Sequence, residues 1–114
     1  MPQQPTKRTL MRATAGALLL LAAPLSMAQA WPARPIRLVV PFPPGGLIDN
    51  MARLVGSRLS QELGQPVAID NKPGAGGNVG AAEAARATAD GYTLLMASPA
   101  LTISPAIYKN LPYQ

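Results

Sequence analysis

The strongest constraint on this fold is the alternation of short, β-branched runs with longer helical runs along the chain. Residues 36–40, 67–69 and 92–97 have the length and composition of buried strands. Residues 49–63 carry apolar side chains at helical spacing, and an alanine-rich helix is expected over residues 79–89. Helical crossovers of this length join parallel strands with right-handed connections. The sequence therefore predicts an α/β protein built on a parallel βαβαβ unit.

The first helix has recognisable ends and one apolar side. Asp49 or Asn50 is expected to cap its first N–H groups, because short polar side chains accept such bonds. Gly64 supplies the C-terminal cap, and Pro66 blocks continuation. The apolar stripe, typical of an amphipathic helix, consists of Met51, Val55, Leu59 and Leu63, with Leu54 beside them.

Three unusual loops follow the three strands, at residues 42–46, 73–78 and 98–102. The first two are rich in glycine and proline, which interrupt regular structure. A short helical turn is expected after Pro105. The carboxyl ends of parallel strands meet at one edge of a sheet, and ligands bind there. We therefore expect the three loops to converge in space.

Two of these loops, at residues 45–46 and 74–78, lead into helix N-termini. Such termini present unpaired N–H groups and a partial positive charge, and glycine lets the backbone approach a ligand closely. Together they predict a receptor for an anion such as a carboxylate. The alternative is that the glycines only form tight turns. Asp49 is better interpreted as a helix cap than as a catalytic base.

The residue types that are missing exclude several kinds of chemistry. The chain has no His and no Cys, which removes the commonest general base, the commonest metal ligand and any thiolate or disulfide. Ser98 therefore lacks a His partner. The spacing of Gly74, Gly76 and Gly80 is one residue longer than the dinucleotide fingerprint, and no P-loop occurs. No catalytic residue, metal site or cofactor is predicted.

Residues 1–30 have the organisation of a cleavable secretory signal. A positively charged start is followed by an apolar run over residues 13–23 and by Ala28-Gln29-Ala30, the pattern read by signal peptidase. Cleavage is expected after Ala30, with an alternative point after Ala28. A membrane anchor is the competing interpretation, but the run is shorter than the roughly 18–20 residues that span a bilayer. No membrane span is expected after cleavage. The positive charges are Lys7, Arg8 and Arg12.

The signal also accounts for most of the basic character of the chain. The net charge is +5 over the whole sequence. After Ala30 there are seven basic and five acidic residues, a net charge of +2 without a basic cluster. Nucleic-acid binding therefore has no electrostatic basis. Residues 31–114 form a small single domain at most.

Five segments together resemble a known family. The two longest read RPIRLVVPFPPGG at residues 34–46 and NKPGAGGNVG at residues 71–80, and shorter matches cover residues 63–67, 90–95 and 108–113. They are similar to the Bug family, the periplasmic substrate-binding proteins of tripartite tricarboxylate transporters. The resemblance covers nearly all of the chain after the signal.

The resemblance implies a two-lobed, Venus-flytrap-like α/β receptor in the periplasm. Residues 31–114 would be part of its first lobe, with the second lobe absent. Such proteins bind small organic anions, often carboxylates or dicarboxylates, and serve the membrane components of a tripartite transporter. The ligand-facing residues carried over by motif are Phe42, Pro44, Gly45, Gly46, Asp49, Ala75, Gly76, Gly77, Asn78, Ser98 and Thr102.

The chain departs from the family pattern at the mouth of this predicted pocket. Leu47 and Ile48 stand where a small residue and Thr usually precede the Asp, which removes a hydroxyl and makes the mouth more apolar. Pro99 and Ala100 replace small polar residues, and Ser104 stands where Asn is frequent. These changes leave the class of anion open.

Two other interpretations remain. The chain ends before a second lobe begins, which favours a truncated or pseudogene fragment without activity of its own. A small exported enzyme is the other alternative, and it lacks an identifiable base.

Overall fold

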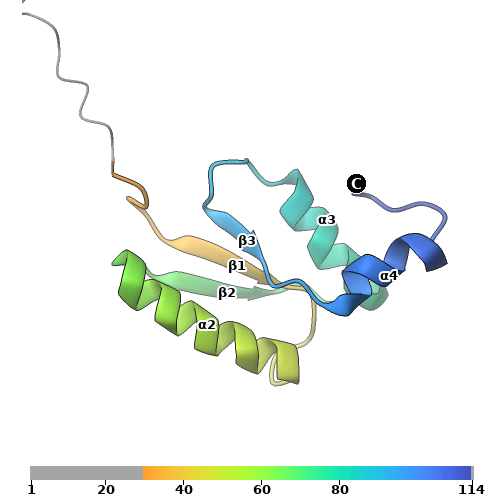
Figure 1. Cartoon of the computed structure of the whole chain (residues 1–114), viewed down its shortest axis with the longest axis horizontal. Helices are drawn as coiled ribbons and strands as arrows, with labels where there is room; N and C mark the ends of the chain where they lie inside the picture. The colour runs from red at the N-terminus through yellow and green to blue at the C-terminus, as the bar shows by residue number, and fades with distance from the viewer. Residues whose placement is uncertain (1–29, 114) are drawn as a thin grey trace, which may run out of the picture.

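The computed structural model describes residues 30–113, so the predicted signal lies outside the described residues apart from Ala30. Three parallel strands form one sheet in the order β2-β1-β3. The strands are β1 (Ile36–Val40), β2 (Val67–Asn71) and β3 (Thr93–Leu95). The parallel βαβαβ unit is thus confirmed (Figure 1). The helical elements are α2 (Leu47–Leu63), the 3-10 turn η1 (Ala75–Gly77), α3 (Asn78–Arg86) and α4 (Pro99–Ile107).

β1 is the centre of the fold because it pairs on both sides. Along its length it pairs with β2, from Ile36 opposite Val67 to Val40 opposite Asn71. β3 pairs with its other edge through three residues. Ile36 and Val40 are fully buried. A strand that is covered on both faces reads as a continuous apolar run, which is the pattern of residues 36–40.

The helices pack on opposite faces of the sheet. Side chains alternate between the faces of a strand, and Leu38 and Val40 meet Ala52 of α2 on one face. On the other face, Arg37 forms ion pairs with Asp70 of β2 and Glu83 of α3. The Nε atom of Arg37 donates to Oδ2 of Asp70 at 2.7 Å. These partly exposed charges link β1, β2 and α3 at one point.

α3 approaches the end of β1 closely because Gly80 has no side chain. An added Cβ at Gly80 would lie 2.8 Å from Cβ and 2.9 Å from Cα of Pro41, and 3.0 Å from the carbonyl oxygen of Lys72. These neighbours immediately precede the first and second loops. The contact therefore sets the distance between α3 and the edge of the sheet where the predicted site lies.

Several predicted boundaries differ from the structure. α2 begins at Leu47 with Gly46 as its N-cap, so the expected cap at Asp49 or Asn50 was wrong. The Asp49 side chain instead accepts a bond from Gly45, before the helix. α3 ends at Arg86 rather than at residue 89, because the next residue is extended. β2 continues two residues further than predicted, and β3 is shorter.

The third loop was also predicted wrongly, because it is largely helical. α4 begins at Pro99 and continues through Pro105, where only a later turn was expected. Ser98 is extended and precedes a proline at the first helical position, where the missing N–H costs nothing. Thr102 lies inside this helix, and its hydroxyl donates to the carbonyl oxygen of Pro99 at 2.8 Å.

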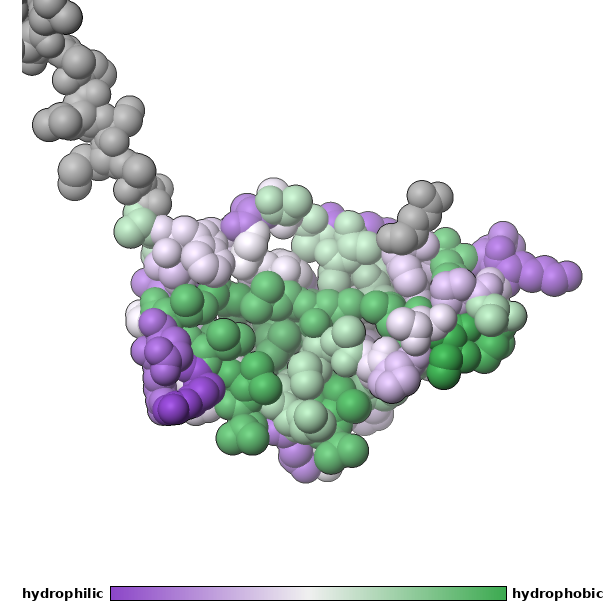
Figure 2. Space-filling view, in the orientation of Figure 1, coloured by the Kyte–Doolittle hydropathy of each residue, from purple (hydrophilic) through white to green (hydrophobic). Residues whose placement is uncertain are grey.

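The apolar stripe of α2 does not form the contact with the sheet. Ala52 and Gly56 are buried there instead. Met51 is 46% exposed, Leu54 74% and Val55 42%. An amphipathic helix normally turns such a stripe to the core, and here small residues let the helix sit close to the sheet beside it. Figure 2 shows apolar residues gathered across this face of the molecule.

Gly80→Ala is expected to destabilise the chain by about 1–3 kcal/mol, because the new methyl group would overlap backbone atoms that cannot move freely. Gly56→Ala is the matched control in another helix interior. Its Cβ would meet side chains rather than backbone, with Cδ1 of Ile69 at 3.1 Å and Cγ1 of Val67 at 3.4 Å, and helix propensity would offset the strain. Urea unfolding measures both changes. Equal losses would contradict the close contact of Gly80 with Pro41.

Candidate functional site

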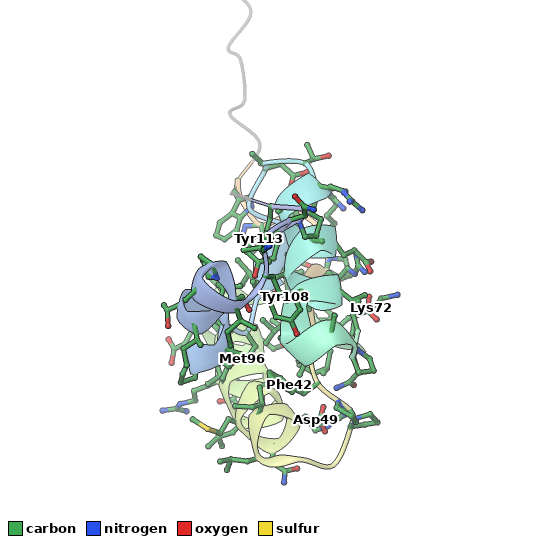
Figure 3. All side chains as sticks on the ribbon, turned by 90° about the vertical axis from the view of Figure 1, so that its right-hand side faces the viewer. Phe42, Asp49, Lys72, Met96, Tyr108 and Tyr113 are labelled. Atoms are coloured by element: carbon green, nitrogen blue, oxygen red, sulfur yellow. The ribbon has the colours of Figure 1, made fainter. Side chains whose placement is uncertain are left out.

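The loops after the three strands converge at one edge of the sheet, as predicted. A crevice of about 10 Å³, room for about one water molecule, is lined by Pro41 just before the first loop, Gly76 and Gly77 of the second, and Ser98 after β3. The ring of Phe42 lies against Gly77, where an added Cβ would be 3.6 Å from Cζ. Figure 3 views the molecule from this edge and labels Phe42 and Asp49.

The buried side chain of Asp49 holds the first loop in place through hydrogen bonds. Its side chain is 1% exposed. Oδ2 accepts the backbone N–H of Gly45 at 2.9 Å and Nε–H of Arg53 at 2.8 Å. Oδ1 accepts a bond from Nδ2 of Asn71 at 2.9 Å. The carboxylate is therefore occupied by three donors of the chain itself, and a direct contact with a ligand stays a prediction.

The same bonds keep Asp49 ionised. The hydrogen bond from Arg53 lowers the pKa of the Asp49 carboxyl most, followed by those from Gly45 and Asn71, and burial opposes them. Together they hold the pKa well below its usual range. Arg53 in turn has its pKa raised by the bond to Asp49. Asp49 is thus a fixed negative charge at the base of the loop and has no free proton to exchange near neutral pH.

The second loop is a tight coil before α3. Residues 74–77 all have positive φ, including Ala75 at 46°. Gly77 has φ 99°, a left-handed conformation that favours glycine, and it opens α3. Asn78 is buried, and its Oδ1 accepts a bond from the hydroxyl of Tyr113 at 2.6 Å. The loop therefore presents exposed backbone at residues 75–76, while the Asn78 side chain is tied to the C-terminal segment.

The predicted ligand-facing residues differ in accessibility. Gly45 and Gly46 are exposed and lead into α2, whose first turn has N–H groups without an acceptor in the helix. Pro44, Ala75, Gly76 and Thr102 are also exposed, and Phe42 and Ser98 are half-buried. The buried members are Asp49, Gly77 and Asn78. The exposed set consists mainly of backbone, which can donate hydrogen bonds to an anion.

Sequence reasoning missed Asn71 and Arg53. The second strand was expected to end at residue 69, whereas Asn71 is the last residue of β2. Its Nδ2 also donates to the carbonyl oxygen of Phe42 at 3.1 Å. Arg53 lies one helical turn after Asp49, which is the spacing of an ion pair on a helix. That spacing was the available signal for the pair.

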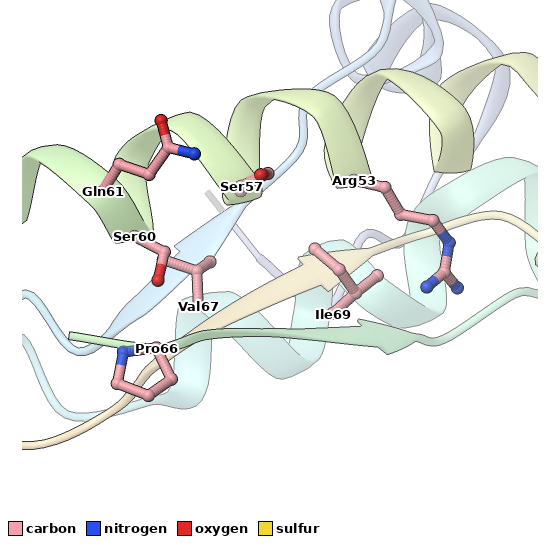
Figure 4. Close-up of a pocket in the computed structure, with 8 residues that line it drawn as sticks. Arg53, Ser57, Ser60, Gln61, Pro66, Val67 and Ile69 are labelled. Atoms are coloured by element: carbon pink, nitrogen blue, oxygen red, sulfur yellow. The ribbon is translucent and has the colours of Figure 1, made fainter.

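A larger hollow lies elsewhere, between α2 and the outer side of β2 (Figure 4). It measures about 550 Å³, and Arg53, Ser57, Ser60, Val67 and Ile69 are among the residues that line it. It is open to solvent and contains none of the predicted ligand-facing residues. We therefore place the candidate site at the converging loops.

Two chemical properties of residues 30–113 bear on the type of site. Within this range there is no group of three His, Cys, Asp or Glu side chains that could hold a metal ion. In the same residues, no helix has the length and apolar character needed to cross a membrane.

Asp49→Asn is expected to lower the free energy of unfolding at neutral pH and to matter little in acid. The pKa of Asp49 is lower in the folded chain than in the unfolded one, so its stabilisation is complete above about pH 4 and is lost as the pH falls through the folded pKa. Urea unfolding from about pH 7 to about pH 2 measures this. Asp90→Asn, at an exposed pair with Arg34, is the control. A difference from the unaltered chain that is constant with pH would contradict the prediction.

A family model described as the tripartite tricarboxylate transporter family receptor matches residues 51–114. Two proteins of Bordetella pertussis are similar in sequence. One, described as a UPF0065 protein, is 48% identical over 93% of this chain and 33% of its own length. The other, protein BugT, is 47% identical over 90% of this chain and 30% of its own length. The chain thus spans about a third of the length of these curated relatives.

Solved structures show the same relationship. One described as a periplasmic transporter is 55% identical with a TM-score of 0.72, over 75% of this chain and 29% of its own. Rpa4515 of R. palustris, solved with adipate, is 41% identical with a TM-score of 0.71 over the same shares. MatC of Rhodopseudomonas palustris, solved with bound malate, is 45% identical over 57% of this chain and 22% of its own, with a TM-score of 0.55.

These relatives are solute-binding proteins rather than enzymes. The family model matches more than half of the chain, and the solved structure described as a periplasmic transporter covers 75% of it. The chain therefore belongs to the receptor family of the tripartite tricarboxylate transporters.

Proposed function

We propose that this chain supplies one wall of the ligand cleft of a periplasmic receptor for a small organic carboxylate. The observation that carries the proposal is the convergence, at one sheet edge, of the two glycine-containing loops that open α2 and α3, where the ring of Phe42 lies against Gly77. Exposed backbone at Gly46 and Gly76 offers N–H donors and the positive ends of two helices to an anion. The ligands of the relatives, adipate and malate, belong to this chemical class.

Export and delivery belong to the same proposal. Residues 1–30 direct the chain to the periplasm and are cleaved after Ala30. The bound anion is then passed to the membrane components of a tripartite transporter. The family to which the chain belongs supports this role.

A second proposal is that this polypeptide is a fragment without independent activity. The observation favouring it is the apolar stripe of α2, which is exposed at Met51, Leu54 and Val55. The chain also spans about a third of its curated relatives. An incomplete cleft would then have too few contacts to hold an anion.

Titration calorimetry with adipate, malate and a tricarboxylate separates the two proposals. We expect heat from at least one carboxylate and none from the dimethyl ester of adipate, because the loops offer donors to a charged group. Absence of heat with every carboxylate would contradict binding by this chain. Heat of binding with any of these carboxylates would contradict a fragment without independent activity.

The N-terminus of the exported protein tests the signal. Mass spectrometry of the chain recovered from the periplasm is expected to give a mature protein that begins at Trp31. Replacing Ala28 and Ala30 by bulky residues should prevent cleavage, since the peptidase reads small side chains at these positions. Recovery of the intact chain in the cytoplasm would contradict export.

A further inference from the structure

Asn71 connects three parts of the candidate site. It is the last residue of β2, and only Lys72 separates it from the second loop. Its Nδ2 donates to the carbonyl oxygen of Phe42 at 3.1 Å and to Oδ1 of Asp49 at 2.9 Å. A side-chain amide nitrogen carries two hydrogens, and both are used here. One half-buried group therefore ties β2, the first loop and α2 together.

The bonds around Asn71 fix the first loop at both ends. Phe42, at its start, is held by the amide of Asn71. Gly45, near its end, is held by Asp49, which Asn71 also contacts. In addition, the backbone N–H of Lys72 donates to the carbonyl oxygen of Val40 at 2.7 Å, so the second loop leaves the sheet in register with the first. The orientation of Gly46 and of the first turn of α2 follows from these restraints.

We propose that Asn71 is the positioning residue of the carboxylate cleft: it acts as an obligatory double donor that holds the first loop in its binding geometry without touching the ligand. The inference rests on the proposed function for its binding readout. The inference sets a chemical requirement on this position. The residue must donate hydrogen bonds to the ionised Asp49 and to a carbonyl oxygen at the same time. An isosteric group that only accepts hydrogen bonds would repel both partners.

Asn71→Asp makes that requirement measurable. Near neutral pH the introduced carboxylate would face the Asp49 carboxylate, and this like charge raises the pKa of the introduced group. Protonation then restores one O–H donor. Arg53 on α2 opposes the shift. The other charges around this end of β2 are Asp70, Lys72, Arg37 and Glu83, which pair with one another.

The experiment compares each variant with the unaltered chain at the same pH, using adipate and malate as probes. At about pH 7.5, Asn71→Asp is expected to weaken binding about tenfold, because a buried acceptor loses its donor. At about pH 4.5 its affinity should return to within about threefold. Asn71→Ala should be weakened at both pH values. Asn110→Asp, at an exposed position in the C-terminal segment, adds the same charge and should leave binding unchanged.

A readout without ligand separates this inference from the proposed function. The amide proton of Gly45, bonded to Asp49, should shift in the NMR spectrum of Asn71→Asp at about pH 7.5 and return at about pH 4.5. If the unaltered chain binds neither probe, the carboxylate proposal fails, while the Gly45 signal still tests the positioning role. Unchanged Gly45 shifts in Asn71→Ala, or an Asn71→Asp chain that behaves alike at both pH values, would overturn the inference.

The unaltered chain provides a test if the variants do not fold. Because both Nδ2 hydrogens of Asn71 are bonded in a half-buried place, they should exchange with solvent more slowly than those of the exposed Asn110. Equal exchange rates for the two side-chain amides would overturn the inference as well.

Discussion

The buried carboxylate of Asp49 is the interaction on which the binding edge depends. A charge removed from water is tolerated only when hydrogen bonds replace its hydration, and the donors here come from three different elements: Gly45 in the first loop, Arg53 in α2 and Asn71 in β2. Satisfying this one group therefore brings loop, helix and strand into a single arrangement. The same hydrogen bonds also orient the loop backbone that remains exposed.

The order of the parallel strands also positions the binding edge. β1 lies between β2 and β3, so the loop that leaves it is flanked by the chain leaving both neighbours. Glycine at positions 77 and 80 lets α3 come within contact of Phe42 and Pro41. A bulkier residue at either position would separate the loops that the sheet brings together. The site is thus a consequence of strand order and of small residues, in addition to the charged network.

Much of this could be predicted from the sequence, for identifiable reasons. β1 was predicted with its observed bounds, because its β-branched run lies between two prolines. The convergence of the loops followed from the order of elements alone. α4 was missed because Pro99 and Pro105 resemble loop residues, although a proline fits the first helical turn. The role of Asp49 was predicted wrongly. A helix cap and the observed acceptor differ only in which N–H groups they bind. Two of the donors, Gly45 and Asn71, are far apart in sequence, so their meeting at Asp49 could not be predicted.

The uncovered stripe of α2 affects how the protein behaves in solution. Leu54 at 74% exposure, with Met51 and Val55 beside it, forms an apolar surface on one side of a helix, and surfaces of this kind drive association when they are contiguous. Such a surface is expected to make the oligomeric state depend on protein concentration. An apparent affinity for a ligand would then depend on the fraction of molecules that are monomeric.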